Sequence, residues 1–279
     1  MDYPKISIVT PNFNKGAFIE ETIRSILDQQ YPNLEYIIID GGSTDNSIDV
    51  IKKYASSLKY WVSEKDDGMY HALERGFQQA TGDIMGWLNS DDILHRKSLF
   101  TVAEIFHTLQ AVDWIQGYPT VIDDAGRIIY SRRARNNKLD FYKKKYRDGI
   151  FIQQESTFWR KKLWEKAGSH ISTDYKYAGD FELWMRFFTN AELYNTSAII
   201  GGFRMYGDGQ ITTNHYDAYL QECDRIIDEM ILKSGKQFSK HLENNKSINF
   251  FKRSPGKPVT EPQLIEYDFA KKRFYLAGL

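Results

Sequence analysis

The sequence predicts an α/β fold with a doubly wound, mostly parallel sheet, followed by a half of mixed α+β structure. Strand-like and helix-like patterns alternate through about the first 112 residues, which is typical of a parallel sheet with helices on both faces. The run Tyr36–Ile39 is apolar without alternation, as expected for a strand that is buried on both faces. Beyond residue 112 the β-like runs are shorter and separate from the helical patterns.

The elements of the first half are divided by clear stop signals. Ile6–Thr10 predicts a strand that ends at the breaker-rich stretch Pro11–Asn14. A helix over 18–27 follows, because apolar residues recur there at helical spacing until Tyr31–Asn33 stops the pattern. After the strand at 36–39, the same reasoning predicts a helix at 48–58, a strand at 60–62, a helix at 69–80 and a strand at 84–88.

The second half contains four β-like runs, at 114–116, 127–130, 156–159 and 198–203. Amphipathic patterns predict helices over 181–188 and 216–233. The polar, proline-containing stretch 234–279 is expected to be an extended tail. We therefore divide the chain into an α/β half (1–112), a mixed half of the same domain (113–215) and a C-terminal helix with a tail (216–279).

Composition excludes several classes of function. Lys plus Arg and Asp plus Glu both number 37, so the formal net charge of zero gives no global field for nucleic acid, and no nucleic-acid partner is expected. The single cysteine, Cys223, excludes an intramolecular disulfide and a cysteine-based zinc site. With no signal-peptide pattern and no apolar run of bilayer length, we expect a cytoplasmic protein.

Carboxylates follow three of the predicted strands. Asp40 follows the second strand, Asp66 and Asp67 the third, and Asp91 and Asp92 the fourth. One aspartate at a strand end is usually a turn former or a helix cap, so the grouping is the signal. Adjacent carboxylates repel each other unless a cation lies between them, and oxygen ligands without His or Cys favour Mg²⁺ or Mn²⁺. The alternative for Asp91-Asp92 is a turn that begins the next helix.

Nucleotide binding at the strand ends is the natural expectation for such a sheet. The phosphate loop of kinases and the glycine pattern of dinucleotide folds are both absent from the sequence. Instead, four other motifs occur in order: Ile8–Asn14, Ile39–Asp45, Asn89–Asp92 and Tyr177–Trp184. Over roughly its first 210 residues the chain resembles glycosyltransferase family 2, which has a Rossmann-like GT-A type fold, and Asn89–Asp92 resembles the family's DXD-type metal motif.

The resemblance implies a donor site for a nucleotide-diphosphate sugar in the first half. Asp40 would accept from the base, Asp91 would lie near the ribose and the metal, and Asp92 would ligate the Mg²⁺ or Mn²⁺ ion that bridges the diphosphate. The full set implied for the nucleotide sugar is Thr10, Pro11, Asn12, Phe13, Asp40, Asp66, Gly68, Asn89, Ser90 and Asp91.

The second half would bind the acceptor, a saccharide or a lipid-linked saccharide. The resemblance makes Asp180 the general base that takes the proton from the acceptor hydroxyl, so that the anomeric configuration inverts. The structural alternative for Asp180 is an N-cap of the following helix, and cap and base are compatible. Gln154, Glu155 and Trp184 are the candidates for acceptor contacts, and a lipid-linked acceptor would imply peripheral contact with the membrane face.

Three features leave alternatives open. Leu73 and Glu74 stand where many members of the family carry an Arg-Asn pair, and Arg75 is a candidate substitute. His215 is either a diphosphate or metal contact or, as is commoner for a lone histidine, structural or simply exposed. The basic and aromatic segment 132–147 is either a solvated face or a surface for a polyanion or a membrane.

Two other functions compete with glycosyl transfer, which would serve polysaccharide or glycoconjugate synthesis. A sugar-phosphate nucleotidyltransferase would need a glycine-rich, basic loop after the first strand. Residues 10–16 contain Pro and Asn, and Lys15 is their only basic residue. A non-catalytic module that binds nucleotide sugars would lack Asp92 or Asp180, and both are present.

Overall fold

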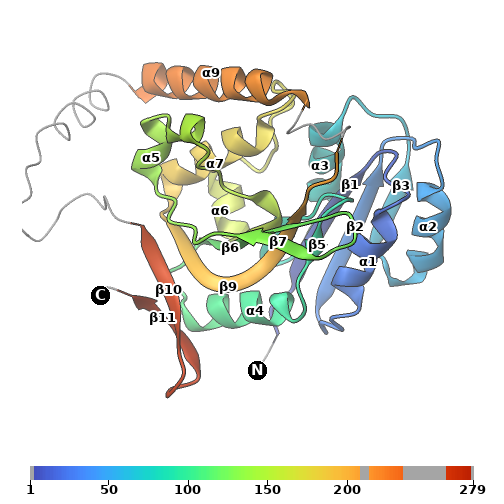
Figure 1. The fold of residues 1–279 in the computed structure, drawn as a ribbon, viewed down its shortest axis with the longest axis horizontal. Coiled ribbons are helices and arrows are strands. Elements are labelled where there is room, and N and C mark those ends of the chain that lie inside the picture. Colours follow the sequence, from blue (N-terminus) through green and yellow to red (C-terminus); the bar gives the residue numbers. More distant parts are fainter. Residues whose placement is uncertain (1–2, 208–213, 235–261, 278–279) are drawn as a thin grey trace, which may run out of the picture.

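A central sheet with helices on both faces organises the chain in a computed structural model, which describes residues 3–207, 214–234 and 262–277 (Figure 1). Within these residues eleven strands form one sheet in the order β11-β10-β9-β6-β8-β4-β1-β2-β3, with β5 paired to β9 and β7 to β6. The strands are β1 (Ile6–Asn12), β2 (Leu34–Asp40), β3 (Tyr60–Ser63), β4 (Ile84–Trp87), β5 (Ile93–Leu94), β6 (Trp114–Ile122), β7 (Ile128–Ser131), β8 (Thr157–Arg160), β9 (Leu193–Arg204), β10 (Gln263–Asp268) and β11 (Arg273–Ala277).

The first four strands run parallel, as the sequence predicts. β1 pairs in parallel with β2 and β4, and β2 with β3. β8 is antiparallel to both β4 and β6, while β6 and β9 are parallel. The sheet is therefore mostly parallel with one reversed strand in its middle, and the fold class is confirmed.

Helices cover both faces because the strands are apolar on both sides. Ile37 and Ile39 of β2 belong to one core cluster with residues of α3, α5, α6, α7 and α9, whereas Ile38 belongs to the other with α1, α2 and α4. Figure 1 shows α4 on one side of the sheet and α5, α6, α7 and α9 on the other. The helices are α1 (Ile19–Leu27), α2 (Ser47–Tyr54), α3 (Met69–Gln78), α4 (Ser98–Thr108), α5 (Lys138–Tyr142), α6 (Lys161–Lys166), α7 (Gly179–Asn190) and α9 (Tyr216–Ser234), with short 3₁₀ turns η1 (Ala55–Ser57), η2 (Lys145–Asp148) and η3 (Gln154–Ser156).

The C-terminal stretch differs from the expected tail. Residues 263–277 form the β10–β11 hairpin, and β10 adds to the sheet beside β9. Ile265 is buried in the core under α4, which explains why a stretch of mostly polar composition is ordered there. The part of the tail at 235–261 lies outside the described residues. No helix in the described part of the chain is long and apolar enough to span a membrane.

Candidate active site

Two cavities adjoin at the carboxyl ends of the parallel strands. The strand-end cavity has a volume of about 730 Å³ and lies between the ends of β1, β2 and β4 and the start of α3. The aromatic cavity, of about 440 Å³, lies between β4, β6, β7, η3 and the helices α7 and α9. Met69, Asn89 and Phe203 line both, so a molecule bound in one cavity can contact a molecule bound in the other.

Most of the expected nucleotide-sugar residues line the strand-end cavity. They are Pro11, Asn12, Phe13, Asp66, Gly68, Asn89, Ser90 and Asp91. The Phe13 ring is 59% exposed, which leaves its face free for a planar ligand. Gly68, at the start of α3, has φ +122 and open space where a Cβ would stand. A glycine is thus needed there for backbone conformation, since an L side chain rarely adopts that φ.

Thr10 and Asp40 are buried beneath this cavity instead of lining it. The Thr10 hydroxyl lies 3.1 Å from the Tyr36 hydroxyl. The Asp40 carboxylate accepts from Asn12 Nδ2 (2.5 Å), Ser43 Oγ (2.5 Å) and Ser63 Oγ (2.6 Å). Burial raises the pKa of Asp40, but the hydrogen bonds, with those from Ser43 first, outweigh it and hold that pKa below its usual range. Asp40 therefore organises the loops under the cavity, and its expected contact with the base is not supported.

The two adjacent aspartates have opposite environments. Asp91 lines the strand-end cavity, and its Oδ2 lies 3.0 Å from Lys15 Nζ and 2.5 Å from the Tyr206 hydroxyl. Asp92 is 1% exposed and lines neither cavity. Its Oδ1 accepts from the Arg204 backbone N–H at 2.9 Å and its Oδ2 from Gln154 Nε2 at 3.1 Å. Burial raises the pKa of Asp92 well above its usual range.

Asp91 and Asp92 were both expected to contact the metal, and this difference favours Asp91 as the ligand. A divalent cation needs a charged oxygen that solvent and diphosphate can reach, which Asp91 offers and Asp92 does not. Asn89 Oδ1, at the junction of the cavities, is buried without a hydrogen-bond partner. The described residues contain no cluster of three or more His, Cys, Asp or Glu around a metal position. One carboxylate with neutral oxygens still fits Mg²⁺ or Mn²⁺, which share their coordination with substrate phosphates.

Lys15 and Tyr206 were not predicted as site residues. Lys15 lines the strand-end cavity from the loop after β1, and its ammonium also lies within hydrogen-bond distance of the Tyr206 hydroxyl. Attraction to Asp91 and that hydroxyl outweighs burial and raises the pKa of Lys15. The basic character of Lys15 was visible in the sequence, but Tyr206 is 115 residues from Asp91 and no local pattern links them.

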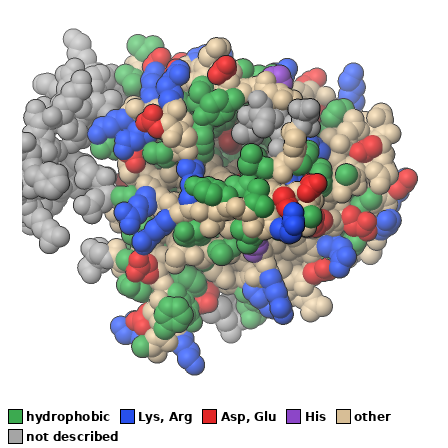
Figure 2. All heavy atoms as spheres, viewed as in Figure 1, with side chains coloured by type: hydrophobic (Ala, Val, Ile, Leu, Met, Phe, Trp, Pro, Cys, Tyr) green, Lys and Arg blue, Asp and Glu red, His purple; other side chains and the backbone are tan. Residues whose placement is uncertain are grey.

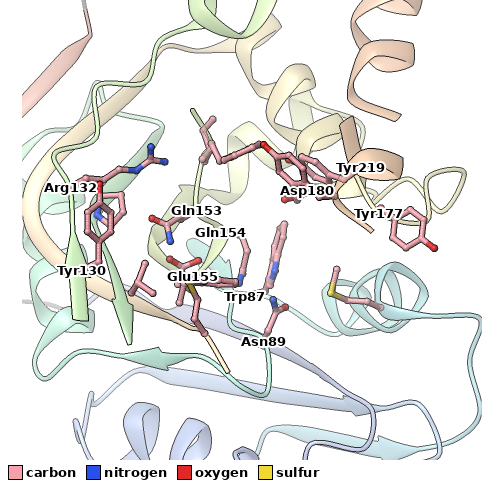
Figure 3. A pocket seen from close by; sticks show the side chains of 18 of the residues that line it. Trp87, Asn89, Tyr130, Arg132, Gln153, Gln154, Glu155, Tyr177, Asp180 and Tyr219 are labelled. Atoms are coloured by element: carbon pink, nitrogen blue, oxygen red, sulfur yellow. The ribbon is translucent and has the colours of Figure 1, made fainter. Parts of the chain in front are cut away.

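The aromatic cavity carries the expected base. Figure 3 shows Asp180 and Tyr219 on one wall, Gln153, Gln154 and Glu155 on another, and Trp87 and Asn89 at the floor of the view. The Tyr70 hydroxyl lies 3.1 Å from Asp180 Oδ1 and 2.8 Å from the Tyr177 carbonyl oxygen. The low polarity of these surroundings raises the pKa of Asp180 to about 6, although the Tyr70 hydrogen bond opposes the shift.

Asp180 is not the N-cap of its helix. The helix α7 begins at Gly179 with Ala178 as N-cap, and no side chain caps it. Glu222 of α9 instead binds the loop that precedes the helix, where its carboxylate accepts from the backbone N–H groups of Lys176 (3.0 Å), Tyr177 (2.8 Å) and Ala178 (2.8 Å). A negative charge near the start of a helix is also favourable. The C-terminal helix thus fixes the segment that carries Asp180.

Trp184 does not contact either cavity. Its ring is 1% exposed and stacks on Trp87 with ring centroids 5.4 Å apart and planes at 5°. Trp87 itself lines the aromatic cavity, so Trp184 supports that wall from behind. The expected acceptor contact of Trp184 is therefore replaced by a packing role, one helical turn after Asp180.

Gln154 and Glu155 do line the aromatic cavity, as expected. Gln154 Oε1 is buried without a hydrogen-bond partner, and Glu155 is 1% exposed. Burial raises the pKa of Glu155, which favours its neutral form. Arg132 also lines this cavity and was not singled out by the sequence.

The features that had open alternatives now have defined surroundings. Arg75 pairs with Glu64 at 2.7 Å and lines neither cavity, so it is not placed to make the ligand contact expected of a substitute arginine. His215 stacks on Tyr177 with ring centroids 4.7 Å apart.

The face seen in Figure 2 carries Lys and Arg interspersed with Asp and Glu. Segment 132–147 follows this pattern, since carboxylates pair with several of its cations, which favours a solvated face.

Comparison with known proteins gives a consistent result. The family model described as "Glycosyl transferase family 2" matches residues 7–167. An uncharacterized glycosyltransferase of Nostoc sp. (strain PCC 7120) is 33% identical over 130 residues, which are 43% of this chain and 40% of the relative. The chain therefore matches less than half the length of that relative.

Two solved structures share the fold at low sequence identity. TarS 1-349 of S. aureus in complex with UDP-GlcNAc has a TM-score of 0.63 at 18% identity, over 80% of this chain and 65% of that one. The mannosyltransferase PcManGT of Pyrobaculum calidifontis, in complex with GDP-Man and Mn²⁺, has a TM-score of 0.55 at 19% identity, over 74% of this chain and 59% of that one.

Proposed function

The chain belongs to glycosyl transferase family 2, and we propose that it is a metal-dependent, inverting glycosyltransferase that moves a sugar from a nucleotide diphosphate to an acceptor hydroxyl. The observation that carries the proposal is the adjoining pair of cavities, with the accessible carboxylate of Asp91 in one and that of Asp180 in the other. We assign residues 1–112 mainly to donor binding and 113–215 mainly to acceptor binding, and Tyr216 and Tyr219 of α9 complete the aromatic cavity.

The donor nucleotide would occupy the strand-end cavity. Phe13 and Pro11 offer an apolar surface for the base, and Asp66 borders the same space. The diphosphate would lie toward Asp91, with Lys15 near enough to contact its oxygens. Mg²⁺ or Mn²⁺ would be held by Asp91 together with the diphosphate, and such an ion supplies Lewis-acid stabilisation of the leaving group. PcManGT, which shares the fold, is in complex with GDP-Man and Mn²⁺, and this supports the assignment.

Asp180 would be the general base. With a pKa raised to about 6, Asp180 would be mostly ionised at pH 7 and could accept a proton as the acceptor oxygen attacks the anomeric carbon. The proton moves from the acceptor hydroxyl to a carboxylate oxygen of Asp180, and the C–O bond to the diphosphate breaks as the new glycosidic bond forms. Tyr70 and Glu222 hold Asp180 in place during this step. Attack on the face opposite the leaving group inverts the configuration.

Donor binding is the first test. Thermal unfolding is followed with UDP-, GDP-, dTDP- and CMP-sugars, each with and without Mn²⁺, because a ligand that binds only the folded state raises its apparent stability. We expect one nucleotide sugar to raise the unfolding temperature in the presence of Mn²⁺, and Asp91→Asn should remove this rise. The control Asp67→Asn changes an exposed residue outside both cavities and should leave the rise intact. No rise with any nucleotide sugar contradicts the proposal.

The base is tested separately. With the donor identified, Asp180→Asn should lower the rate of transfer by about 10²–10⁴-fold while the donor-dependent thermal shift stays, because the residue lies in the other cavity. Transfer at the wild-type rate would show that Asp180 is not the base.

A further inference from the structure

Arg132 is the cation of segment 132–147 that lines the aromatic cavity. It follows β7 directly and is partly buried. Its Nη1 donates to the Gly149 carbonyl oxygen at 2.9 Å, and no carboxylate of the described residues lies within ion-pair distance of its guanidinium. Four of its five N–H donors are therefore without a protein acceptor in this part of the chain.

Four of the eight cations in segment 132–147 have carboxylate partners. Arg133 pairs with Glu266 at 3.0 Å, and Lys145 pairs with Asp140. Lys144 lies 3.0 Å from Asp228, and Arg147 pairs with Asp224. Arg132 lacks such a partner, as do Arg135, Lys138 and Lys143 among the described residues. Of these four cations, Arg132 is the one that lines the aromatic cavity, where a ligand can supply the anion.

The carboxyls of the cavity do not form an ion pair with Arg132. Burial raises the pKa of Glu155, which disfavours its charged form, although the charge of Arg132 opposes this shift. Asp180 lies near Tyr70 and the start of α7, at the other side of the cavity from Arg132 in Figure 3. A partly buried guanidinium without an ion-pair partner is unfavourable, and its planar fork of donors matches a phosphate or a carboxylate.

We propose that the aromatic cavity binds acceptors that carry a phosphate or a carboxylate, and that Arg132 pairs with this anionic group. The assignment of the cavity to the acceptor rests on the proposed function. Aromatic walls from Tyr130, Phe151 and Tyr216 suit the apolar faces of a sugar ring, so the acceptor class is a saccharide with an acidic substituent.

The anionic group has two chemical sources. It can be part of the sugar, as in a uronic acid, or it can be the phosphate that links a sugar to a lipid. The second source has a surface available, because Ile128 and Ile129 of β7 are 52% and 58% exposed immediately before Arg132. Both sources use the same contact with Arg132, and an experiment can separate them.

The experiment is a binding titration followed by tryptophan fluorescence, since Trp87 lines the cavity. The probes are glucose, glucuronate, glucose 1-phosphate and a short-chain alkyl phosphosugar. We expect at least one anionic probe to bind roughly 10- to 100-fold more tightly than glucose, the gain typical of a hydrogen bond to a charged group. Arg132→Gln should abolish this preference, and Arg133→Gln, the matched control outside the cavity, should keep it.

Equal binding of glucose and all anionic probes, or an unchanged preference in Arg132→Gln, would overturn the inference. If the alkyl phosphosugar binds more tightly than glucose 1-phosphate and Ile129→Ser removes this difference, the phosphate comes from a lipid-linked acceptor. If glucuronate binds most tightly and the alkyl chain adds no affinity, the anionic group is part of the sugar. Donor binding with Mn²⁺ tests the proposed function alone, because Arg132 does not line the strand-end cavity. The inference about Arg132 and the proposed function can therefore be refuted separately.

Discussion

Replacing Glu222 with glutamine should change both the stability of the chain and the pH at which Asp180 becomes active. The carboxylate accepts three backbone N–H groups just before α7, two of them on Oε2 and one on Oε1. An amide keeps one acceptor oxygen, so at least one of these N–H groups loses its partner. The loss of a hydrogen bond to a charged group costs about 1.5–3 kcal/mol.

The same substitution removes a negative charge near the base. Burial is the largest cause of the raised pKa of Asp180, and the charge of Glu222 contributes in the same direction. Tyr219 and Cys223 of α9 and Tyr70 of α3 also face this carboxyl, and none of them is charged at pH 7, since their own pKa values are raised. The pKa of Asp180 in Glu222→Gln should therefore fall.

The assay is the pH dependence of kcat/KM for transfer. In the wild type, activity should rise with pH and reach half its plateau near pH 6, because only the ionised carboxylate accepts a proton. In Glu222→Gln the half-maximum should move to lower pH. Asp228→Asn, on the exposed side of the same helix, is the control and should leave the profile unchanged. An unmoved profile in Glu222→Gln, or one moved to higher pH, would refute this reasoning.

Three further predictions concern other parts of the site. Lys15→Met should bind Mn²⁺ more tightly than the wild type in the absence of donor, because it removes a cation 3.0 Å from Asp91. Binding is measured by electron paramagnetic resonance, and weaker binding would contradict the idea that Lys15 and the metal compete for Asp91. Glu155→Gln should gain stability relative to the wild type as pH rises from 5 to 8, because the folded wild type holds a proton on Glu155 that the unfolded chain releases. The gain in the free energy of unfolding, measured by urea titration, should be at most about 1.4 kcal/mol per pH unit. A difference that stays constant with pH would show that this carboxyl is ionised in the folded protein. Trp184→Ala should destabilise the fold by about 3–5 kcal/mol in the same titrations, and a loss of acceptor binding without a loss of stability would restore its role as a contact residue.

The fold was largely predictable because its signals are local. The run Tyr36–Ile39 shows two-sided burial in its composition, and its residues do divide between the two core clusters. The β10–β11 hairpin was missed, because its strands are short and mostly partly exposed and only the pairing with β9 makes them stable. That pairing joins residues about 70 positions apart, which no local pattern contains.

The site was predictable to the level of loops but not of individual side chains. The motif Asn89–Asp92 does lie at the cavity junction, yet which aspartate faces solvent depends on Arg204 and Gln154, whose sequence positions are distant. Arg132 and Glu222 escaped notice for a similar reason: each looks like an ordinary surface charge until the fold brings its surroundings together. Site residues that act through packing or long-range hydrogen bonds therefore required the structure.

The anomeric configuration of the product is the most direct test of the proposed mechanism. Transfer from a donor of known configuration is followed by ¹H nuclear magnetic resonance, and the coupling constant of the new anomeric proton is read before any equilibration. A single base at Asp180 with no covalent intermediate predicts inversion, so an α-linked donor sugar should give a β-linked product. Retention of configuration would contradict direct attack by the acceptor and the role assigned to Asp180.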